Sequence, residues 1–162
     1  METLPLRHFC QLCLDEAQNK LKVLRSIKIT IPSDLNALSQ VLVQFNQIHQ
    51  DFIPQRDWLQ CRIAVAEGFT NAVKHAHKNL STDTLIHIEV MLNEAAMEIR
   101  VWDYGAPFDL HNYIAETSHQ NQDWIASGRG IPILTKISDR LEYRRLENQR
   151  NCLVIVKKFA NL

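Results

Sequence analysis

The chain has 162 residues with 18 basic and 18 acidic side chains, so its formal net charge is zero and no basic field points to a nucleic-acid ligand. Hydrophobic residues make up 46% and charged residues 22% of the chain, which is typical of one globular domain. No apolar run approaches the roughly 18 residues of a membrane span, and the N-terminus has no signal-peptide pattern, so we expect a cytoplasmic protein.

The hydrophobic pattern predicts secondary structure in chain order. Alternation predicts strands, and a period of about 3.6 residues predicts helices. Strands are expected at 25–31, 85–92, 96–102, 140–146 and 152–159, and helices at 35–49, 57–78 and 130–139. Residues 1–24 are expected to be a short helical extension before a domain at 25–162, and 105–127 a long connection without clear periodicity. This order predicts an α+β fold, a two-layer α/β sandwich with helices on one face of a largely antiparallel mixed sheet.

Two local features in the first third of the chain also carry predictions. Cys10 and Cys13 have the CxxC spacing of redox or zinc sites, but neither the βαβ context nor a second ligand pair is evident. Two small, reduced, buried or half-buried residues are therefore expected there. Ser33 or Asp34 is expected to cap the helix at 35–49, and Asp57 to cap the next helix.

Three polar side chains lie four residues apart in the predicted helix at 57–78. Glu67, Asn71 and His75 fall on one helix face, beside or within its apolar stripe. Polar groups that are half-buried there need partners, because an unpaired one costs roughly 1–3 kcal/mol. A divalent cation with phosphates satisfies all three, and so does a buried hydrogen-bond network. His77, on another face, is predicted to be solvent-exposed.

Two glycine motifs follow further along the chain. The segment Asp103-Tyr104-Gly105-Ala106-Pro107 comes after a strand-like run and opens a loop, where Asp before Gly is by itself typical of an Asx turn. The segment Gly128-Arg129-Gly130 precedes a helical pattern, so its backbone N–H groups and the helix N-terminus offer an anion site. Arg129 either neutralises phosphate charge or points into solvent.

Taken in this order, the three segments resemble the N, G1 and G2 boxes of the ATPase/kinase superfamily that includes gyrase B, MutL and the sensor histidine kinases. The short E-x3-N-x3-H box and the D-x-G-x-P-F-D loop are most similar to those of the bacterial anti-sigma-factor serine kinases. The resemblance runs from about residue 27 to 159, and it implies the histidine-kinase-like ATPase fold.

The resemblance implies a role for each member of the triplet. Asn71 would be the ligand of Mg²⁺, a cation that keeps several waters and takes phosphate oxygens. Glu67 would be the catalytic general base for an incoming hydroxyl, unless it is an exposed side chain paired with Arg62 or Lys74. His75 would orient the phosphates of ATP, or else be a satisfied half-buried histidine.

The resemblance also implies how the nucleotide is held. Asp103 resembles the aspartate that accepts a hydrogen bond from the adenine amino group, and Gly105 lets the backbone approach the base. The other nucleotide contacts that the motifs imply are Asn71, His75, Pro107, Gly128, Arg129 and Gly130. The family usually opens its last strand with a Gly-Thr pair, where this chain has Asn151-Cys152, and this departure weakens the expected adenine anchoring.

The function implied by the resemblance is an ATP-dependent serine/threonine protein kinase that uses MgATP and acts as an anti-sigma factor in partner switching. It would bind a sigma factor, phosphorylate a STAS-type anti-sigma-factor antagonist and work as a homodimer, without direct contact with nucleic acid or membrane. The alternative is a catalytically weak nucleotide-binding module that sequesters a partner protein. Asn151-Cys152 favours the module, whereas Glu67 favours the enzyme.

Overall fold

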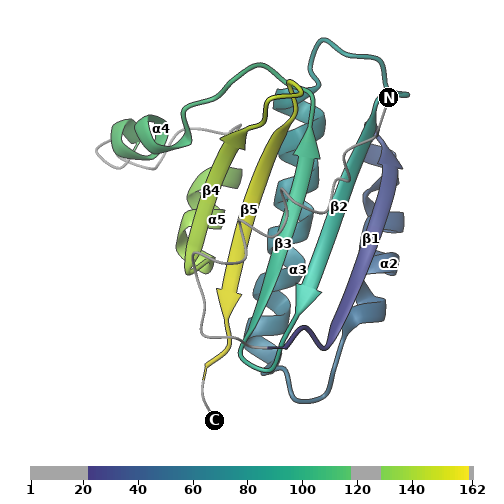
Figure 1. The fold of residues 1–162 in the computed structure, drawn as a ribbon, viewed down its shortest axis with the longest axis vertical. Coiled ribbons are helices and arrows are strands. Elements are labelled where there is room, and N and C mark those ends of the chain that lie inside the picture. Colours follow the sequence, from purple (N-terminus) through teal and green to yellow (C-terminus); the bar gives the residue numbers. More distant parts are fainter. Residues whose placement is uncertain (1–21, 118–128, 161–162) are drawn as a thin grey trace, which may run out of the picture.

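Five strands form one sheet in the computed structural model, which describes residues 22–117 and 129–160. The strands are β1 (Arg25–Pro32), β2 (Leu85–Leu92), β3 (Ala96–Asp103), β4 (Arg140–Arg145) and β5 (Asn151–Lys158). Their order in the sheet is β1-β2-β3-β5-β4, and all four neighbouring pairs are antiparallel (Figure 1). Strand β5 therefore lies between β3 and the edge strand β4.

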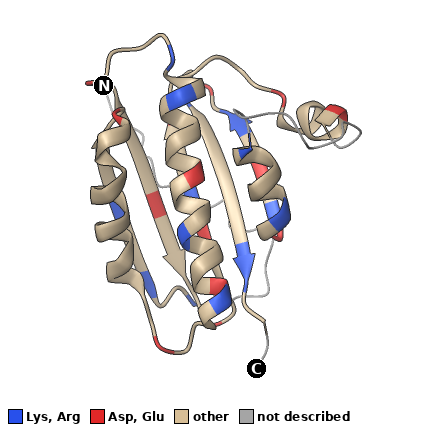
Figure 2. Cartoon of the chain, turned by 180° about the vertical axis from the view of Figure 1, so that it is seen from behind, with Lys and Arg blue, Asp and Glu red and all other residues tan. Residues whose placement is uncertain are grey.

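The main helices lie on one face of this sheet. The helical segments are η1 (Leu35–Ala37), α2 (Leu38–Phe45), η2 (Asn46–Ile48), α3 (Gln55–Asn71), η3 (Ala72–Ala76, a π-helix), α4 (Leu110–Thr117) and α5 (Gly130–Ile137). Helices α2, α3 and α5 lie behind the sheet in Figure 1 and in front of it in Figure 2, whereas α4 lies beyond the β4 edge. The predicted two-layer α+β sandwich is confirmed. No helix among the described residues is both long enough and apolar enough to cross a membrane.

The hydrophobic core lies between the sheet and these helices. Helix α3 buries one face, and Phe69 in that face is fully buried. The ring of Phe45 in α2 stacks on that of Trp58 in α3, with centroids 4.8 Å apart. A Cβ atom on Gly68 would lie 3.0 Å from Cγ2 of Val101, so α3 approaches β3 closely at this glycine. This packing fixes α3, which carries the polar triplet, against the middle of the sheet.

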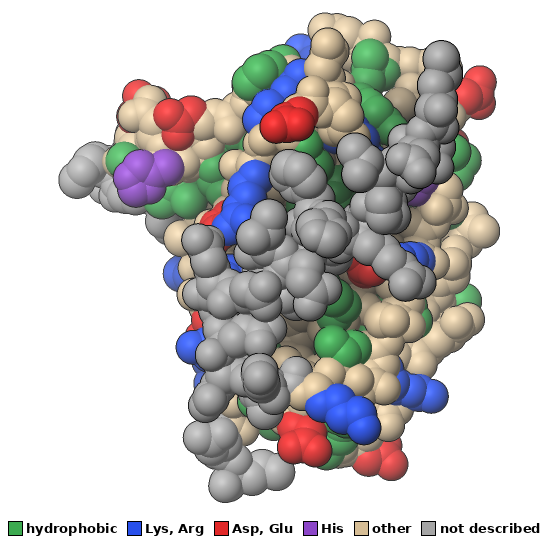
Figure 3. Space-filling model, in the orientation of Figure 1, with side chains coloured by type: hydrophobic (Ala, Val, Ile, Leu, Met, Phe, Trp, Pro, Cys, Tyr) green, Lys and Arg blue, Asp and Glu red, His purple; other side chains and the backbone are tan. Residues whose placement is uncertain are grey.

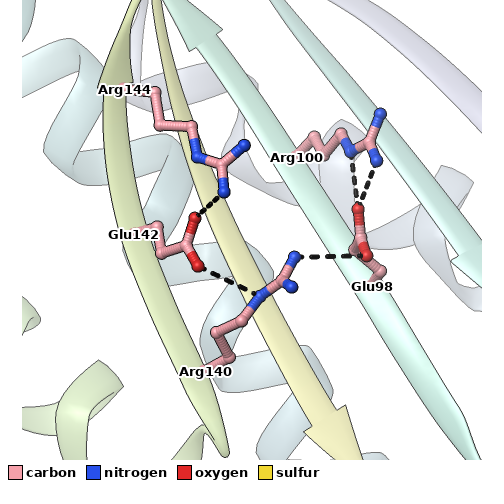
Figure 4. Close-up of polar contacts among 5 residues, drawn as sticks. All are labelled: Glu98, Arg100, Arg140, Glu142 and Arg144. Atoms are coloured by element: carbon pink, nitrogen blue, oxygen red, sulfur yellow. Dashed lines mark hydrogen bonds and ion pairs between the residues drawn. The ribbon is translucent and has the colours of Figure 1, made fainter. Parts of the chain in front are cut away.

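The opposite face of the sheet carries a network of ion pairs (Figure 4). Nε and Nη2 of Arg100 each lie 2.6 Å from Oε1 of Glu98 on the same strand. Arg140 on β4 reaches both Glu98, at 3.8 Å, and Glu142, at 3.4 Å, and Arg144 also pairs with Glu142. Figure 3 shows both basic and acidic side chains on the described part of this face, so this part is not a patch of a single charge sign.

Helix α4 was not expected, because residues 105–127 were predicted to be a connection without periodic structure. Asp109 begins this helix: its Oδ1 accepts a hydrogen bond from the backbone N–H of Asn112, and its carbonyl oxygen accepts one from that of Tyr113. Leu110 is buried and Ile114 packs against the core, so the helix has one apolar side. An aspartate followed by apolar residues at this spacing is a helix-start signal that the sequence interpretation missed.

Two predictions about helix ends have different outcomes. Asp34 does cap η1, since its side chain accepts a hydrogen bond from the backbone N–H of Asn36. Asp57 is not a cap: it is the third residue of α3, which begins after Pro54, and it is buried. Its Oδ2 accepts a 2.7 Å hydrogen bond from the backbone N–H of Ala160, so this carboxylate joins α3 to the segment after β5.

Some predictions lie outside the described residues. These are the ones for residues 1–21, which include Cys10 and Cys13, and the one for Gly128.

Candidate functional site

The first and third motifs meet where the N-terminus of α5 packs on the end of α3. A Cβ atom on Gly130, the first residue of α5, would lie 2.6 Å from Oδ1 of Asn71 and 2.8 Å from Oε2 of Glu67. A Cβ at such distances would displace these side chains, so the polar ends of Glu67 and Asn71 point directly at the N-terminus of α5. Glu67 and Asn71 are separated from Gly130 by about 60 residues of sequence, and the fold brings them into contact.

Among the described residues, neither Asn71 nor Glu67 has the partners of a purely structural network. Nδ2 of Asn71 is buried and forms no hydrogen bond in the part of the chain that the structure describes. Among residues 22–117 and 129–160, no ion pair joins Glu67 to a basic side chain, so the alternative pairing with Arg62 or Lys74 is absent there. His75 lies in the π-helical turn η3 and is exposed.

The second motif packs on the end of this same helix. A Cβ atom on Gly105 would lie 2.7 Å from Cα of Ala76 and 2.8 Å from its carbonyl oxygen, so the loop after β3 touches the backbone of η3. The backbone N–H of Tyr104 donates a 2.9 Å hydrogen bond to Nε2 of His77. The three motifs predicted from the sequence therefore form one continuous region of the structure.

His77 is buried, with 3% of its surface exposed, so the prediction that it is solvent-exposed is wrong. The π-helical turn that precedes it and the loop after β3 enclose the ring. Because Nε2 accepts a hydrogen bond, the neutral ring carries its proton on Nδ1. Burial lowers the pKa of His77, and the charge of Asp103 opposes that shift.

Asp103 is 3% exposed and accepts hydrogen bonds from three groups of this chain. Its Oδ1 accepts hydrogen bonds from the backbone N–H of Gly105 at 2.8 Å and from Nδ2 of Asn151 at 2.7 Å. The Tyr143 hydroxyl lies 2.8 Å from Oδ2 and 3.0 Å from Oδ1. The bond to Gly105 is the Asx turn that is by itself typical of the Asp-x-Gly pattern. A carboxylate with this many donors is held in one orientation.

Asn151 occupies the position where the sequence departs from the family pattern. It is fully buried, and its Nδ2 donates both to Asp103 and, at 3.1 Å, to the carbonyl oxygen of Gly105. Nη1 of Arg145 donates to that same carbonyl oxygen at 2.7 Å and to Oδ1 of Asn151 at 3.0 Å. Asn151 thus binds the Asp103 loop directly.

Tyr143 and Arg145 were missed at the sequence level. Register pairs Asp103 with Asn151 and Asn151 with Arg145 across β3, β5 and β4, so the three residues form one row of the sheet. Only the pairing of β4 with β5 reveals this row, and no local motif marks it. Burial raises the pKa of Tyr143, and the charge and hydrogen bond of Asp103 act in the same direction.

A pocket of about 740 Å³ opens beside this row, between the start of α4 and β4. That volume lies within the range of small-ligand sites. Its lining residues are Pro107, Phe108, Asp109, Leu110, His111, Ile114, Leu141, Glu142, Tyr143, Arg144, Arg145 and Asn151. Of the predicted nucleotide contacts, Pro107 lines this pocket, and Arg129 is exposed at the N-terminus of α5.

The sequence matches a known domain family across this whole region. The model of the histidine kinase-like ATPase domain matches residues 31–157, which include every described residue of the site. The chain belongs to this family. The fold and the order of the three motifs expected from the resemblance agree with that assignment.

Curated relatives with detectable similarity are bacterial serine-protein kinases. Serine-protein kinase RsbW of Listeria monocytogenes is 47% identical over 49 residues, which are 30% of this chain and 31% of that protein. Serine-protein kinase RsbW of Bacillus pumilus is 28% identical over 106 residues, which are 62% of this chain and 64% of that protein. These matches span about a third and just under two thirds of the relatives' own lengths.

Solved structures show the same fold. The structure of the RsbU and RsbW domains of Rv1364c from Mycobacterium tuberculosis superposes with a TM-score of 0.59 at 15% identity, covering 85% of this chain and 33% of that one. A chain of the SiaB-SiaC complex from Pseudomonas aeruginosa superposes with a TM-score of 0.50 at 12% identity, covering 98% of this chain and 100% of that one. At these identities the likeness is one of fold.

Proposed function

We propose that this chain is an ATP-dependent serine/threonine protein kinase that acts as an anti-sigma factor in partner switching. Its substrate in this proposal is a STAS-type anti-sigma-factor antagonist, its other partner is a sigma factor, and its working form is a cytoplasmic homodimer. The observation that carries the proposal is the meeting of Glu67, Asn71 and Gly130 at the N-terminus of α5. The RsbW names of the curated relatives support the class of reaction.

Asn71 fits the role of a magnesium ligand. Its side chain is half-buried, its Nδ2 lacks a partner among the described residues, and its Oδ1 points at the space beside Gly130 that a Cβ would fill. A carboxamide oxygen is a suitable ligand for Mg²⁺, which takes its remaining ligands from water and phosphates. When bound with ATP, the metal supplies charge neutralisation for phosphoryl transfer. The backbone N–H groups at the start of α5 are suited to phosphate oxygens.

Glu67 fits the role of general base. It lies one turn before Asn71 on α3, and its Oε2 shares the space beside Gly130 with Oδ1 of Asn71. A carboxylate there can accept the proton of a serine or threonine hydroxyl as that hydroxyl attacks the γ-phosphate. The proton would move to Glu67, the γ-phosphoryl group would move to the hydroxyl oxygen of the protein substrate, and the bond from its phosphorus to the bridging oxygen would break to leave ADP. Exposed His75 and Arg129 are proposed to contact phosphate oxygens.

One observation favours the second candidate function, a nucleotide-binding module with weak catalysis that sequesters a partner protein. Asp103, the residue proposed to read the adenine amino group, is already bound by Tyr143 and Asn151. A protein that binds nucleotide only weakly could still hold a partner without phosphorylating it. The two functions differ in whether a phosphate reaches the partner.

The test uses the purified chain, MgATP and STAS-domain proteins from the same genome. We expect phosphoserine or phosphothreonine on one STAS partner, located by mass spectrometry. Glu67→Gln should abolish the transfer, because removal of a general base typically costs about 10²–10⁴-fold in rate, while ATP affinity and partner binding stay near wild type.

Glu116→Gln is the matched control, since Glu116 is an exposed residue of α4. It should phosphorylate the partner at the wild-type rate. Confirmed ATP and partner binding by the wild-type chain without any phosphate transfer would remove the kinase and leave the binding module.

A further inference from the structure

The hydrogen-bond donors around Asp103 are all committed. Both N–H bonds of the Asn151 amide are used, one on Oδ1 of Asp103 and one on the carbonyl oxygen of Gly105. Nη1 of Arg145 donates to that carbonyl and to Oδ1 of Asn151. This pattern fixes the orientation of the Asn151 amide, with its nitrogen toward Asp103 and its oxygen toward Arg145.

The two oxygens of Asp103 are not equivalent. Oδ1 accepts from the Gly105 N–H and from Asn151, and the Tyr143 hydroxyl lies 3.0 Å away. Oδ2 accepts only the Tyr143 hydroxyl among the described residues, at 2.8 Å. The phenol has one proton to donate, and a hydrogen bond to a carboxylate is stronger than a neutral one. Oδ2 is therefore the oxygen with capacity left, and the Tyr143 hydroxyl is the donor that it already has among the described residues.

Tyr143 stands between Asp103 and the pocket. Tyr143 and Asn151 line the 740 Å³ pocket, while Asp103, 3% exposed, is not one of the described residues that line it. The ring of Tyr143 packs edge-on against that of Phe108, with centroids 5.8 Å apart, and Phe108 lines the pocket as well. A ligand entering the pocket meets the phenol before it meets the carboxylate.

We infer that the Tyr143 hydroxyl occupies the acceptor face of Asp103 that the exocyclic amine of an adenine nucleotide would use, so that binding of the base is a competition with this residue. The inference rests on the proposed function, because it takes Asp103 to be the residue that reads the base. An amino group needs an acceptor, and Oδ2 is the Asp103 oxygen with the fewer donors among the described residues. The base must therefore displace the phenol from that oxygen. Tyr143 then lowers nucleotide affinity and is an affinity-determining residue of the site.

The decisive variant is Tyr143→Phe, which removes the hydroxyl and keeps the ring against Phe108. We expect the Kd for MgADP and for MgATP, measured by isothermal titration calorimetry, to fall by about tenfold. This change in affinity is modest for the loss of one competing hydrogen bond to a charged group. If the hydroxyl instead supported the site, Tyr143→Phe would bind both nucleotides more weakly than wild type. Tyr113→Phe is the matched control, because Tyr113 also packs on Phe108 but has no hydrogen bond to Asp103.

A second measurement reads Tyr143 directly in the wild-type chain. The protein has three tyrosines, so ¹³Cζ-tyrosine labelling gives three NMR signals that the Tyr→Phe variants assign. MgADP should move the Tyr143 signal toward that of a tyrosine without a carboxylate partner and leave the Tyr113 signal nearly unchanged.

Wild type that binds MgADP with an unmoved Tyr143 signal, or Tyr143→Phe that binds it equally or more weakly, would overturn the competition while leaving the nucleotide site intact. If neither wild type nor Tyr143→Phe binds MgADP or MgATP, the proposed function itself fails and the competition fails with it.

Discussion

The first residue of α5 is in contact with the end of α3, since a Cβ atom on Gly130 would lie 2.6 Å from Oδ1 of Asn71. The atoms that such a Cβ would meet are the ends of the Asn71 and Glu67 side chains, which can rotate away. At Gly105 the nearest atoms are Cα and the carbonyl oxygen of Ala76, which cannot. The two glycines therefore differ, because a side chain at Gly130 would meet movable side-chain ends and one at Gly105 would meet backbone.

Gly130→Ala should impair the site more than the fold. The new methyl group displaces the side chains of Asn71 and Glu67, so we expect the affinity for MgATP to fall by at least about tenfold. The free energy of unfolding should change little, because alanine is a better helix former than glycine by about 1 kcal/mol and this offsets the displacement. Calorimetric titration and chemical denaturation measure the two effects separately.

Gly105→Ala should show the reverse balance. Here the methyl group meets backbone, and overpacking of this kind costs about 1–3 kcal/mol. Denaturation midpoints of the two variants provide the comparison. Equal destabilisation by Gly130→Ala and Gly105→Ala would mean that the side chains beside Gly130 are as immovable as the backbone of Ala76.

Asn71→Ala should lose nucleotide binding and keep the fold. Nδ2 of Asn71 forms no hydrogen bond in the described part of the chain, so its removal breaks no interaction that stabilises the free protein. Wild type at 100 times Kd of MgATP should gain about 2.7 kcal/mol in the free energy of unfolding, and the variant should gain nothing. Asn79→Ala, at an exposed position, is the control and should respond as wild type does. An Asn71→Ala protein that is still stabilised by MgATP would exclude Asn71 as the magnesium ligand.

The burial of His77 predicts a pH dependence of stability. Burial lowers the pKa of His77 below its ordinary value of 6.5, so the folded state binds fewer protons than the unfolded state as the pH falls through that value. The free energy of unfolding should therefore fall between pH 7.5 and pH 5.5, and the His77–Tyr104 hydrogen bond should be lost with it. His77→Gln keeps a hydrogen-bond acceptor but does not titrate, so it should reduce the slope of the free energy of unfolding against pH.

His87 has a lowered pKa as well, from burial and from the charge of Arg150, and it contributes with the same sign. His87→Gln is thus the companion variant, and each single variant should remove only its own share of the slope. Denaturation at several pH values gives these slopes directly. A slope that His77→Gln leaves unchanged would assign the whole effect to other groups.

The ion pairs on the open face of the sheet should differ in their contribution to stability. The Arg100 side chain is 4% exposed, so Glu98→Ala, which removes one of its ion pairs, should cost more than the roughly 1 kcal/mol of an exposed pair. The pair of Glu142 with Arg144 has both side chains about one-third exposed, and Glu142→Ala should cost less than about 1 kcal/mol. Urea denaturation of the two variants checks this, and equal costs would show that burial of Arg100 does not matter.

Much of the fold could be predicted from the sequence because its signals are local. Alternation placed the strands at 85–92 and 140–145 within a residue or so, and periodicity placed α5. The E-x3-N-x3-H spacing placed Glu67 and Asn71 on one face of α3, and the Asp-x-Gly pattern is by itself typical of the Asx turn found at Asp103. A helix or strand imposes its period on neighbouring residues, so such features can be recognised without knowledge of the rest of the chain.

The partners of these residues depend on contacts between distant segments. The Tyr143–Asp103 hydrogen bond spans 40 residues and the contact of Asp57 with Ala160 spans 103. The burial of His77 depends on the loop after β3. Each of these contacts requires either the pairing of β5 with both β3 and β4 or the packing of α3 on the sheet. A one-residue change of register would turn every side chain of a strand to the other face. The sequence therefore determined which groups are candidates for the chemistry, and the register of the sheet determined which of them meet.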